Sequence, residues 1–282
     1  MRSPTVLSLA AAWAIAGVSP AAAIVVRHDI ADEKFRADPA AYPELFWLYT
    51  GRQGYRICVA TLIAPQWAIT AAHCTQDSPL ARAMAAPAPA FEVRIAGRPH
   101  SIDRVVRHPS WDGETGVDMA LLRLSEPVDG VRPAPLYLAG DEPGLRVLMV
   151  GWGGVGTGLT GAKAPDPHLR VAGQRIDRAD GHELVWAFDA PHSGRAEPDE
   201  GISGPGDSGG PALLEAGEGV RCVVGVSSRQ ETDGKPEGVY GVREYYARVS
   251  AAADWIREVA GAATAACPGP RAGASTPAST PR

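Results

Sequence analysis

The sequence predicts an all-β fold with one helix near its C-terminal end. Apolar stretches recur as short pieces, most of them rich in β-branched or aromatic residues and bounded by Gly, Pro or Asp, which is the pattern of strands. Many short strands with few helical stretches favour a sandwich or a barrel. A chain of 282 residues forms one or two domains and can bury a substantial core.

The expected elements follow one another along most of the chain. The strands are expected over residues 46–49, 55–63, 67–70, 91–95, 102–106, 119–124, 145–150, 184–188, 211–214 and 221–227. Residues 77–90, rich in Ala and Pro, predict an exposed loop after a short helical turn, and the Gly-rich residues 153–167 predict a mobile loop. The helix is expected from about Ser250 to Ala260, with Ser250 as its N-cap.

The two ends of the chain have the composition of segments outside the fold. Arg2 gives a positive start, residues 7–18 form an apolar run, and three alanines end at Ala23, which together resemble a secretory signal. The run is short for a bilayer span, and a buried helix is the alternative interpretation. We therefore expect a signal peptide over 1–23, a secreted or periplasmic mature chain without a stable membrane anchor, and a disordered Pro/Ser/Thr/Ala-rich tail over 268–282.

Charge and cysteine content exclude some functions. A net charge of −5 argues against nucleic-acid binding driven by phosphate attraction, and no polybasic stretch indicates a membrane surface. Export would place the four cysteines in an oxidising compartment, where disulfides persist. Their spread along the chain, at Cys58, Cys74, Cys222 and Cys267, does not resemble a compact zinc site. We expect two disulfides and no metal, with three pairings open.

Three short motifs carry chemistry. Ser208 lies in a run of glycines, directly after Asp207, where the backbone can bend sharply and aim successive N–H groups at one point. His73 ends an apolar stretch, and Asp118 precedes a stretch that looks buried. Taken singly, each motif has an ordinary interpretation: a turn, a surface histidine and a capping aspartate.

Together the three residues form a nucleophilic set. A serine hydroxyl needs a base within hydrogen-bond reach, and histidine can take and return a proton near neutral pH. The imidazole in turn needs an acceptor at its other nitrogen, which holds its tautomer and stabilises the imidazolium. Ser208, His73 and Asp118 can supply these roles.

The motifs closely resemble those of the chymotrypsin/trypsin-like serine proteases and occur in that family's order. The matching segments are Ala71-Ala72-His73-Cys74, Asp118-Met119-Ala120-Leu121-Leu122 and Gly206-Asp207-Ser208-Gly209-Gly210-Pro211, with further matches at 61–65, 151–153, 248–250 and 254–256. The resemblance extends from Ile24 to about Ile256. It implies two six-stranded antiparallel β-barrels with a cleft between them. We expect a protease domain over residues 24–267, with the first barrel over about 24–137 and the second barrel and helix over about 138–267.

The resemblance also implies roles for particular residues. His73, Asp118 and Ser208 would be catalytic, and the N–H groups of Gly206 and Ser208 would form the oxyanion hole. Disulfides would join Cys58 to Cys74 and, as the weaker inference, Cys222 to Cys267.

Asp207 would pair with a newly exposed N-terminus, typically Ile-Val in this family. Ile24-Val25 directly follows the expected signal cleavage. We therefore hypothesise that signal cleavage itself activates the protein. The alternative is that Ile24 merely begins a strand.

The expected substrate pocket departs from the family. Ile202 occupies the position of the trypsin aspartate, six residues before Ser208, and an apolar floor disfavours a desolvated Lys or Arg. We therefore expect cleavage after apolar residues, in a pocket also lined by Ser228 and Gly238. Two alignments of the far wall remain open. In one, Gly238-Val239-Tyr240 is the family's Gly-Val-Tyr; in the other, Tyr245-Tyr246 takes that place and the insertion lies earlier.

The sequence therefore predicts a secreted serine endopeptidase that acts through an acyl-enzyme and needs no metal or organic cofactor. The expected partners are a protein or peptide substrate and a protein inhibitor, and we expect a monomer. A protease-like binding protein without turnover is the alternative, because the pocket differs from the family pattern.

Overall fold

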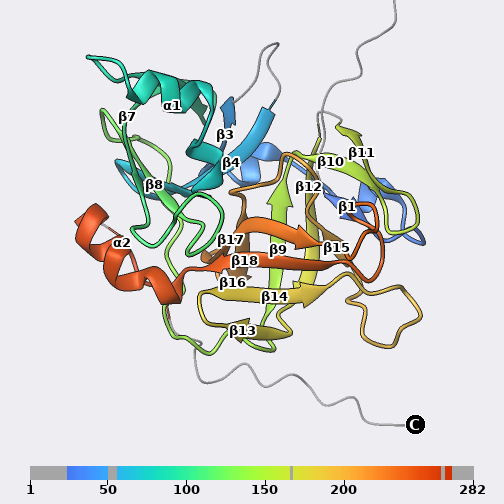
Figure 1. Ribbon diagram of the computed structural model, residues 1–282. Helices are drawn as coiled ribbons and strands as arrows, with labels where there is room; N and C mark the ends of the chain where they lie inside the picture. The colour runs from blue at the N-terminus through green and yellow to red at the C-terminus, as the bar shows by residue number, and fades with distance from the viewer. Residues whose placement is uncertain (1–23, 50–55, 166–167, 262–263, 269–282) are drawn as a thin grey trace, which may run out of the picture.

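The computed structural model describes residues 24–49, 56–165, 168–261 and 264–268. The expected signal peptide and all but the first residue of the expected tail lie outside these ranges. Within them the chain is mostly β, with three sheets and two short α-helices (Figure 1). Neither of these helices has the length and apolar character that a membrane span requires.

The first sheet has six antiparallel strands in the order β3-β4-β5-β8-β7-β6. They are β3 (Leu45–Tyr49), β4 (Arg56–Ala64), β5 (Trp67–Thr70), β6 (Phe91–Ile95), β7 (Arg98–Arg107) and β8 (Ala120–Leu124). The two edge strands, β3 and β6, lie beside each other, so the sheet curls into a near-barrel. Fully buried apolar side chains such as Ile63, Ile69 and Leu121 belong to its core.

The second sheet has eight strands in the order β13-β14-β18-β17-β16-β9-β12-β2. They are β2 (Arg36–Ala37), β9 (Arg146–Gly151), β12 (Leu169–Arg175), β13 (Arg178–Asp180), β14 (Glu183–Ala187), β16 (Pro211–Glu215), β17 (Arg221–Glu231) and β18 (Arg243–Arg248). The expected second six-stranded barrel is corrected here, because no strand ladder closes this sheet within the described residues. Instead, Gln174 Nε2 on β12 donates a 3.1 Å hydrogen bond to Ala187 O on β14, so a side chain bridges these two strands.

A small third sheet has the order β11-β10-β1-β15. Its strands are β1 (Val25–Val26), β10 (Gly154–Thr157), β11 (Gly161–Pro165) and β15 (Gly201–Ile202). The Gly-rich interval that we expected to be a loop therefore contains a hairpin. Its glycines permit a close approach of the two strands, since a Cβ at Gly156 would lie 1.9 Å from Gly161 O.

The helices are short. Helix α1 (Pro79–Met84) lies inside the interval 77–90 that we expected to be an exposed loop, and α2 (Ala253–Ala260) follows a 3₁₀ turn at Ser250–Ala252. Ser250 does not cap α2, because its hydroxyl donates to Glu142 Oε1 at 2.5 Å. Helix α2 packs beside β8 of the first sheet (Figure 1). Three further 3₁₀ turns are Asp32–Lys34, Pro39–Ala41 and His73–Thr75.

Two disulfides reinforce this architecture. Cys58 on β4 is bonded to Cys74 in the turn after β5. Cys222 on β17 is bonded to Cys267, beyond α2. Both pairs agree with the pairing that the family resemblance implies.

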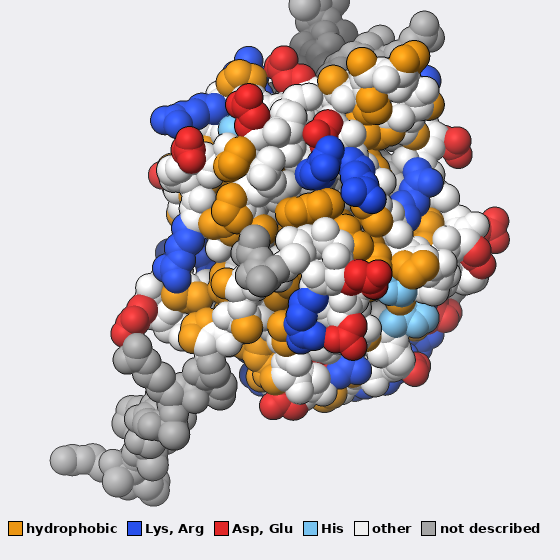
Figure 2. All heavy atoms as spheres, turned by 90° about the vertical axis from the view of Figure 1, so that its left-hand side faces the viewer, with side chains coloured by type: hydrophobic (Ala, Val, Ile, Leu, Met, Phe, Trp, Pro, Cys, Tyr) orange, Lys and Arg blue, Asp and Glu red, His pale blue; other side chains and the backbone are white. Residues whose placement is uncertain are grey.

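The face in Figure 2 carries positive and negative side chains interspersed among apolar and uncharged atoms.

Candidate active site

Ser208 is held between the first and second sheets. Its carbonyl accepts a 2.8 Å hydrogen bond from Val59 N on β4, and the next amide, Gly209 N, donates a 2.8 Å bond to Ser227 O on β17. Gly209 has a φ of +77°, and a Cβ there would lie 2.2 Å from Thr70 Oγ1. A glycine is therefore required where the serine turn approaches the first sheet.

His73 and Asp118 come from different parts of the first sheet. His73 begins the 3₁₀ turn that follows β5, and Asp118 lies just before β8. These neighbouring strands bring the two residues together. The His73 backbone N–H donates to Asp118 Oδ1 at 2.9 Å, and the ring Nδ1 lies 2.6 Å from Oδ2.

The carboxyl group of Asp118 determines the tautomer of His73. Burial alone would raise the pKa of Asp118, but hydrogen bonds and charge from His73, together with the Ser228 hydroxyl, hold it below its usual value. An ionised carboxylate can only accept, so His73 Nδ1 carries the proton in this contact. When the ring is neutral, Nε2 is left with a free lone pair, as a general base requires.

Ser228 holds Asp118 from the opposite sheet. Its hydroxyl donates to Asp118 Oδ2 at 2.6 Å. Because Ser228 is on β17, the bond links the second sheet directly to the buried carboxylate.

Ser208 and His73 line the same cavity, here called the Ser208 cavity, whose volume is about 520 Å³. Its lining includes His73, Ser203, Gly206, Ser208, Gln230 and Glu244. In the described part of the chain no hydrogen bond joins Ser208 Oγ to His73; the ring Nε2 lies 3.7 Å from Cys74 Sγ. Hydrogen bonds of catalytic groups are often loose until substrate binds.

The backbone amides of Gly206 and Ser208 indicate a site that could bind an anion. Gly206 has a φ of +106°, and among the described contacts neither Gly206 N nor Ser208 N donates a hydrogen bond. Both residues line the Ser208 cavity. Free N–H groups placed in this way can hold an oxygen that becomes negative.

Asp207 accepts several backbone N–H groups inside the protein. It bonds to Ile24 N at 3.1 Å, Gly204 N at 2.9 Å and Gly153 N at 2.6 Å. Burial raises the pKa of Asp207, and these donors oppose the rise. Ile24 is 1% exposed and has a φ of +55°, which is rare for a β-branched side chain. Ile24 and Asp207 are thus together, as the sequence-based hypothesis requires.

Two residues expected in the substrate pocket lie elsewhere. Ile202 pairs with Val25 in the third sheet and packs in a buried cluster with Phe188 and Val242, outside the lining of the Ser208 cavity. Gly238 N donates to Gln230 Oε1, and the Gly238 backbone lies against Val25. Ile202 therefore does not form the floor of this cavity, and the expected apolar preference loses its support.

Polar residues line the inner part of the cavity instead. Ser203 follows Ile202, and its hydroxyl lies 2.8 Å from Tyr246 OH. Tyr246 pairs with Ser227 across β17 and β18. This register favours the second of the two alignments of the far wall, in which Tyr245-Tyr246 takes the place of the family's Gly-Val-Tyr and the insertion lies earlier in the chain. Glu244, two residues before Tyr246, then lines the cavity, although the sequence analysis missed it.

A second cavity of about 620 Å³ lies on the other side of His73. Trp111, His182, Glu183 and Arg229 are among its lining residues. The two cavities share His73, Ser228 and Arg229 in their linings.

A metal site is not supported by the one group of potential ligands found among the described residues, Cys58, His73 and Cys74. Both cysteines are in the same disulfide and have no thiolate to offer.

Comparison with known proteins gives a consistent picture. A family model described as "Trypsin" matches residues 36–256. A trypsin of Phaedon cochleariae is 31% identical over 225 residues, which cover 72% of this chain and 79% of that protein. A trypsin of Saccharopolyspora erythraea is 30% identical over 214 residues, covering 73% of this chain and 87% of that protein.

Proposed function

This chain belongs to the trypsin family, and we propose that it is a serine endopeptidase that uses Ser208, His73 and Asp118. The observation that carries the proposal is the pair of hydrogen bonds from His73 to the buried Asp118 carboxylate, beside the cavity that contains Ser208. A histidine held in this way can accept a proton at Nε2, which is what a serine nucleophile needs.

In the proposed mechanism, Ser208 Oγ attacks the carbonyl carbon of the scissile peptide while its proton passes to His73 Nε2. The carbonyl oxygen becomes negative and is held by Gly206 N–H and Ser208 N–H. The imidazolium then gives its proton to the leaving amine as the C–N bond breaks. Water attacks the acyl-serine with His73 again as base, which releases the carboxyl product and restores the Ser208 hydroxyl.

Activation is proposed to depend on Ile24. Cleavage before this residue would create an α-ammonium beside Asp207, where the backbone N now donates at 3.1 Å. It would also remove the peptide bond that defines the unfavourable φ of Ile24. Because the residues before Ile24 resemble a secretory signal, we propose that export and activation coincide. The two disulfides are compatible with an oxidising compartment.

The direct test is a digest of a diverse peptide library, with cleavage sites mapped by mass spectrometry. Protein that begins at Ile24 is compared with its Ser208→Ala variant, after circular dichroism has shown that both are folded. We expect cuts that disappear in the variant. The absence of Ser208-dependent cuts by folded protein would support the alternative, a protease-like binding protein.

A further inference from the structure

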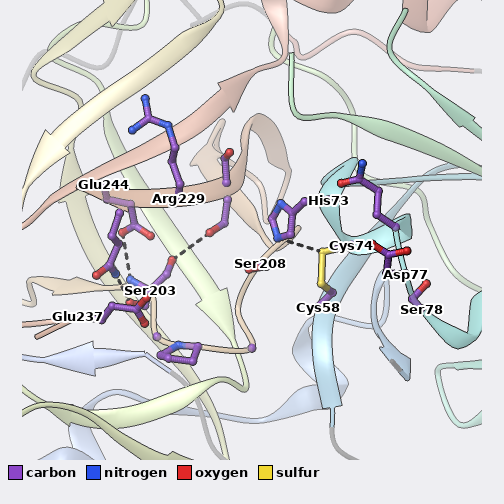
Figure 3. Close-up of a pocket in the computed structure, with 17 residues that line it drawn as sticks. Cys58, His73, Cys74, Asp77, Ser78, Ser203, Ser208, Arg229, Glu237 and Glu244 are labelled. Carbon is purple, nitrogen blue, oxygen red and sulfur yellow. Dashed lines mark hydrogen bonds between the residues drawn. A yellow bond between two sulfur atoms is a disulfide. The ribbon is translucent and has the colours of Figure 1, made fainter. Parts of the chain in front are cut away.

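Glu244 is a buried acid at the inner end of the Ser208 cavity. It lies on β18, paired in register with Gln230 of β17 and Trp186 of β14. Its side chain lines the cavity although the residue is only 1% exposed, and it accepts a 3.0 Å hydrogen bond from Ser203 N at Oε2. Figure 3 shows Glu244 and Ser203 on one side of the cavity and His73 with its neighbouring disulfide on the other.

This carboxyl group has no cation to balance it in the described part of the chain. The buried Glu142 pairs with Arg248 at 2.6 Å, and the buried Glu197 pairs with Arg175 at 2.7 Å. The pKa of Glu244 depends on its burial, on hydrogen bonds and on the charge of Asp207. No Lys or Arg is among the groups that affect it. A buried carboxylate without a cation is costly, so a positive group that enters the cavity would be favoured there.

Arg229 lines the same cavity but is engaged elsewhere. Its guanidinium donates to Glu183 at 3.0 Å and stacks on the Tyr245 ring at 3.7 Å. Tyr245 is adjacent to Glu244 on β18, and neighbouring side chains on a strand point to opposite faces. In Figure 3 Arg229 extends away from Glu244. Arg229 therefore does not occupy the place of a counter-ion for Glu244.

The rest of the cavity is also suited to a cation. The exposed acids Asp77 and Glu237 line it together with Glu244, while Arg229 is the one basic residue in its lining, His73 apart. The Ser203 hydroxyl, which contacts Tyr246 OH at 2.8 Å, adds a polar group at the inner end. Walls of one charge sign concentrate ligands of the opposite sign.

We propose that Glu244 is the specificity-determining residue of this protein, and that the Ser208 cavity takes the cationic side chain, lysine or arginine, of the residue whose carbonyl Ser208 attacks. The inference rests on the proposed function, because cleavage supplies that carbonyl. In this proposal, an acid on β18 determines the substrate preference, and Ile202 in the segment before the serine does not. The expected preference is then for cationic side chains, the reverse of the apolar preference expected from sequence.

The titration of Glu244 supports the proposal. Burial raises the pKa of Glu244 to about 7, and the hydrogen bonds from Ser203 oppose that rise. The carboxyl group is therefore largely neutral below that pH and ionised above it. A bound ammonium or guanidinium favours the ionised form and lowers this pKa. Other charged groups that face the cavity are His73, Asp77, Glu237 and Arg229, and buried Asp207 lies nearby.

The first experiment compares two peptides that differ only by Lys or Met before the scissile bond. We expect kcat/KM to be about a hundredfold higher for the Lys peptide near pH 8, and this ratio to fall about tenfold near pH 6. The ratio cancels every pH effect on catalytic steps that the two peptides share. In Glu244→Gln the ratio should fall about a hundredfold and lose its pH dependence. The matched control is Glu258→Gln, an exposed acid on α2, which should keep the wild-type ratio.

The second experiment needs no catalysis. Ser208→Ala protein is titrated by calorimetry with benzamidine, an aryl amidinium, and with benzamide, its neutral counterpart. We expect the amidinium to bind at least about tenfold more tightly near pH 8, with the advantage lost near pH 5 and in Ser208→Ala/Glu244→Gln. If Glu244→Gln does not fold, the pH dependence in the Ser208→Ala protein decides.

The outcomes separate the two proposals. Amidinium binding without any Ser208-dependent cleavage would retain Glu244 as the acid that binds a cation in this cavity and reject the proposed endopeptidase. Cleavage after apolar residues, with a Lys/Met ratio that Glu244→Gln leaves unchanged, would reject the role of Glu244 and retain the endopeptidase. Equal binding of the amidinium and the amide at both pH values would also overturn the inference.

Discussion

Ser228 Oγ donates a 2.6 Å hydrogen bond to Asp118 Oδ2, the same oxygen that lies 2.6 Å from His73 Nδ1. The bond joins β17 of the second sheet to Asp118, which lies two residues before β8 of the first. The orientation of the histidine therefore depends on how the two sheets pack, as well as on the local sequence around His73.

Replacing Ser228 with alanine should lower both stability and activity. The loss of a hydrogen bond to a charged group costs about 2 kcal/mol, and a less well-held His73 should lower kcat by roughly tenfold to a hundredfold. Urea unfolding and steady-state kinetics measure the two effects. Ser193→Ala, at an exposed position, is the control and should change neither.

The same variant has a predictable pH dependence. The folded-state pKa of Asp118 is below its usual value, so its contribution to stability is present above the unfolded pKa and is lost as pH falls through the folded pKa. The stability difference between wild type and Ser228→Ala should therefore be full near neutral pH and shrink in acid. A difference that stays constant down to strongly acid pH would contradict this linkage.

A free N-terminus at Ile24 should be required for full activity. A buried ion pair broken from one side costs about 3–5 kcal/mol, so a two-residue extension before Ile24 should lower Tm and reduce kcat/KM by about a hundredfold or more. Mature protein with Val in place of Ile24 is the control. N-terminal sequencing of secreted protein should find Ile24 first, and a fully active extended protein would reject the activation hypothesis.

Glu142 and Arg248 should be strongly coupled. Glu142 is fully buried, pairs with Arg248 at 2.6 Å and accepts the Ser250 hydroxyl. Removing one partner leaves an uncompensated buried charge, so Glu142→Gln or Arg248→Met should each cost about 3–5 kcal/mol. The double variant should lose less than the sum of the two, as measured by urea unfolding. Additive losses would mean that the pair is not energetically coupled.

Glu200 should make stability fall as pH rises toward neutrality. It is 1% exposed, and burial raises its pKa to about 7, although Asp189 N, Glu197 N and Gln174 Nε2 all donate to it. The folded protein then holds a proton that the unfolded chain releases at lower pH, so stability decreases between about pH 4.5 and pH 7, by up to about 3 kcal/mol. Glu200→Gln should remove the part of this slope that Glu200 contributes and leave the part due to Glu244, whose pKa is also raised, while Glu258→Gln should leave the whole slope unchanged.

Local sequence was enough to predict many elements and much of the candidate site. Strands such as β5 and β9 are nearly continuous apolar runs, which burial on both faces favours. His73, Asp118 and Ser208 each lie in a distinctive short motif, so they could be selected before any contact was known. The sequence pattern missed β18, because Arg243 and Glu244 interrupt its apolar character.

By itself, then, the sequence determined the β-rich class and the identity of the family, and it singled out the residues that we propose as the nucleophilic set. Only the tertiary structure decided which buried acid lines the cavity. Counting six residues back from Ser208 reaches Ile202, but the direction of that side chain depends on the pairing of β15 with β1. Glu244, distant in sequence, reaches the Ser208 cavity because the register of β17 with β18 places it opposite Gln230. Side-chain direction alternates along a strand, so a one-residue change in register would reverse which residue faces the cavity.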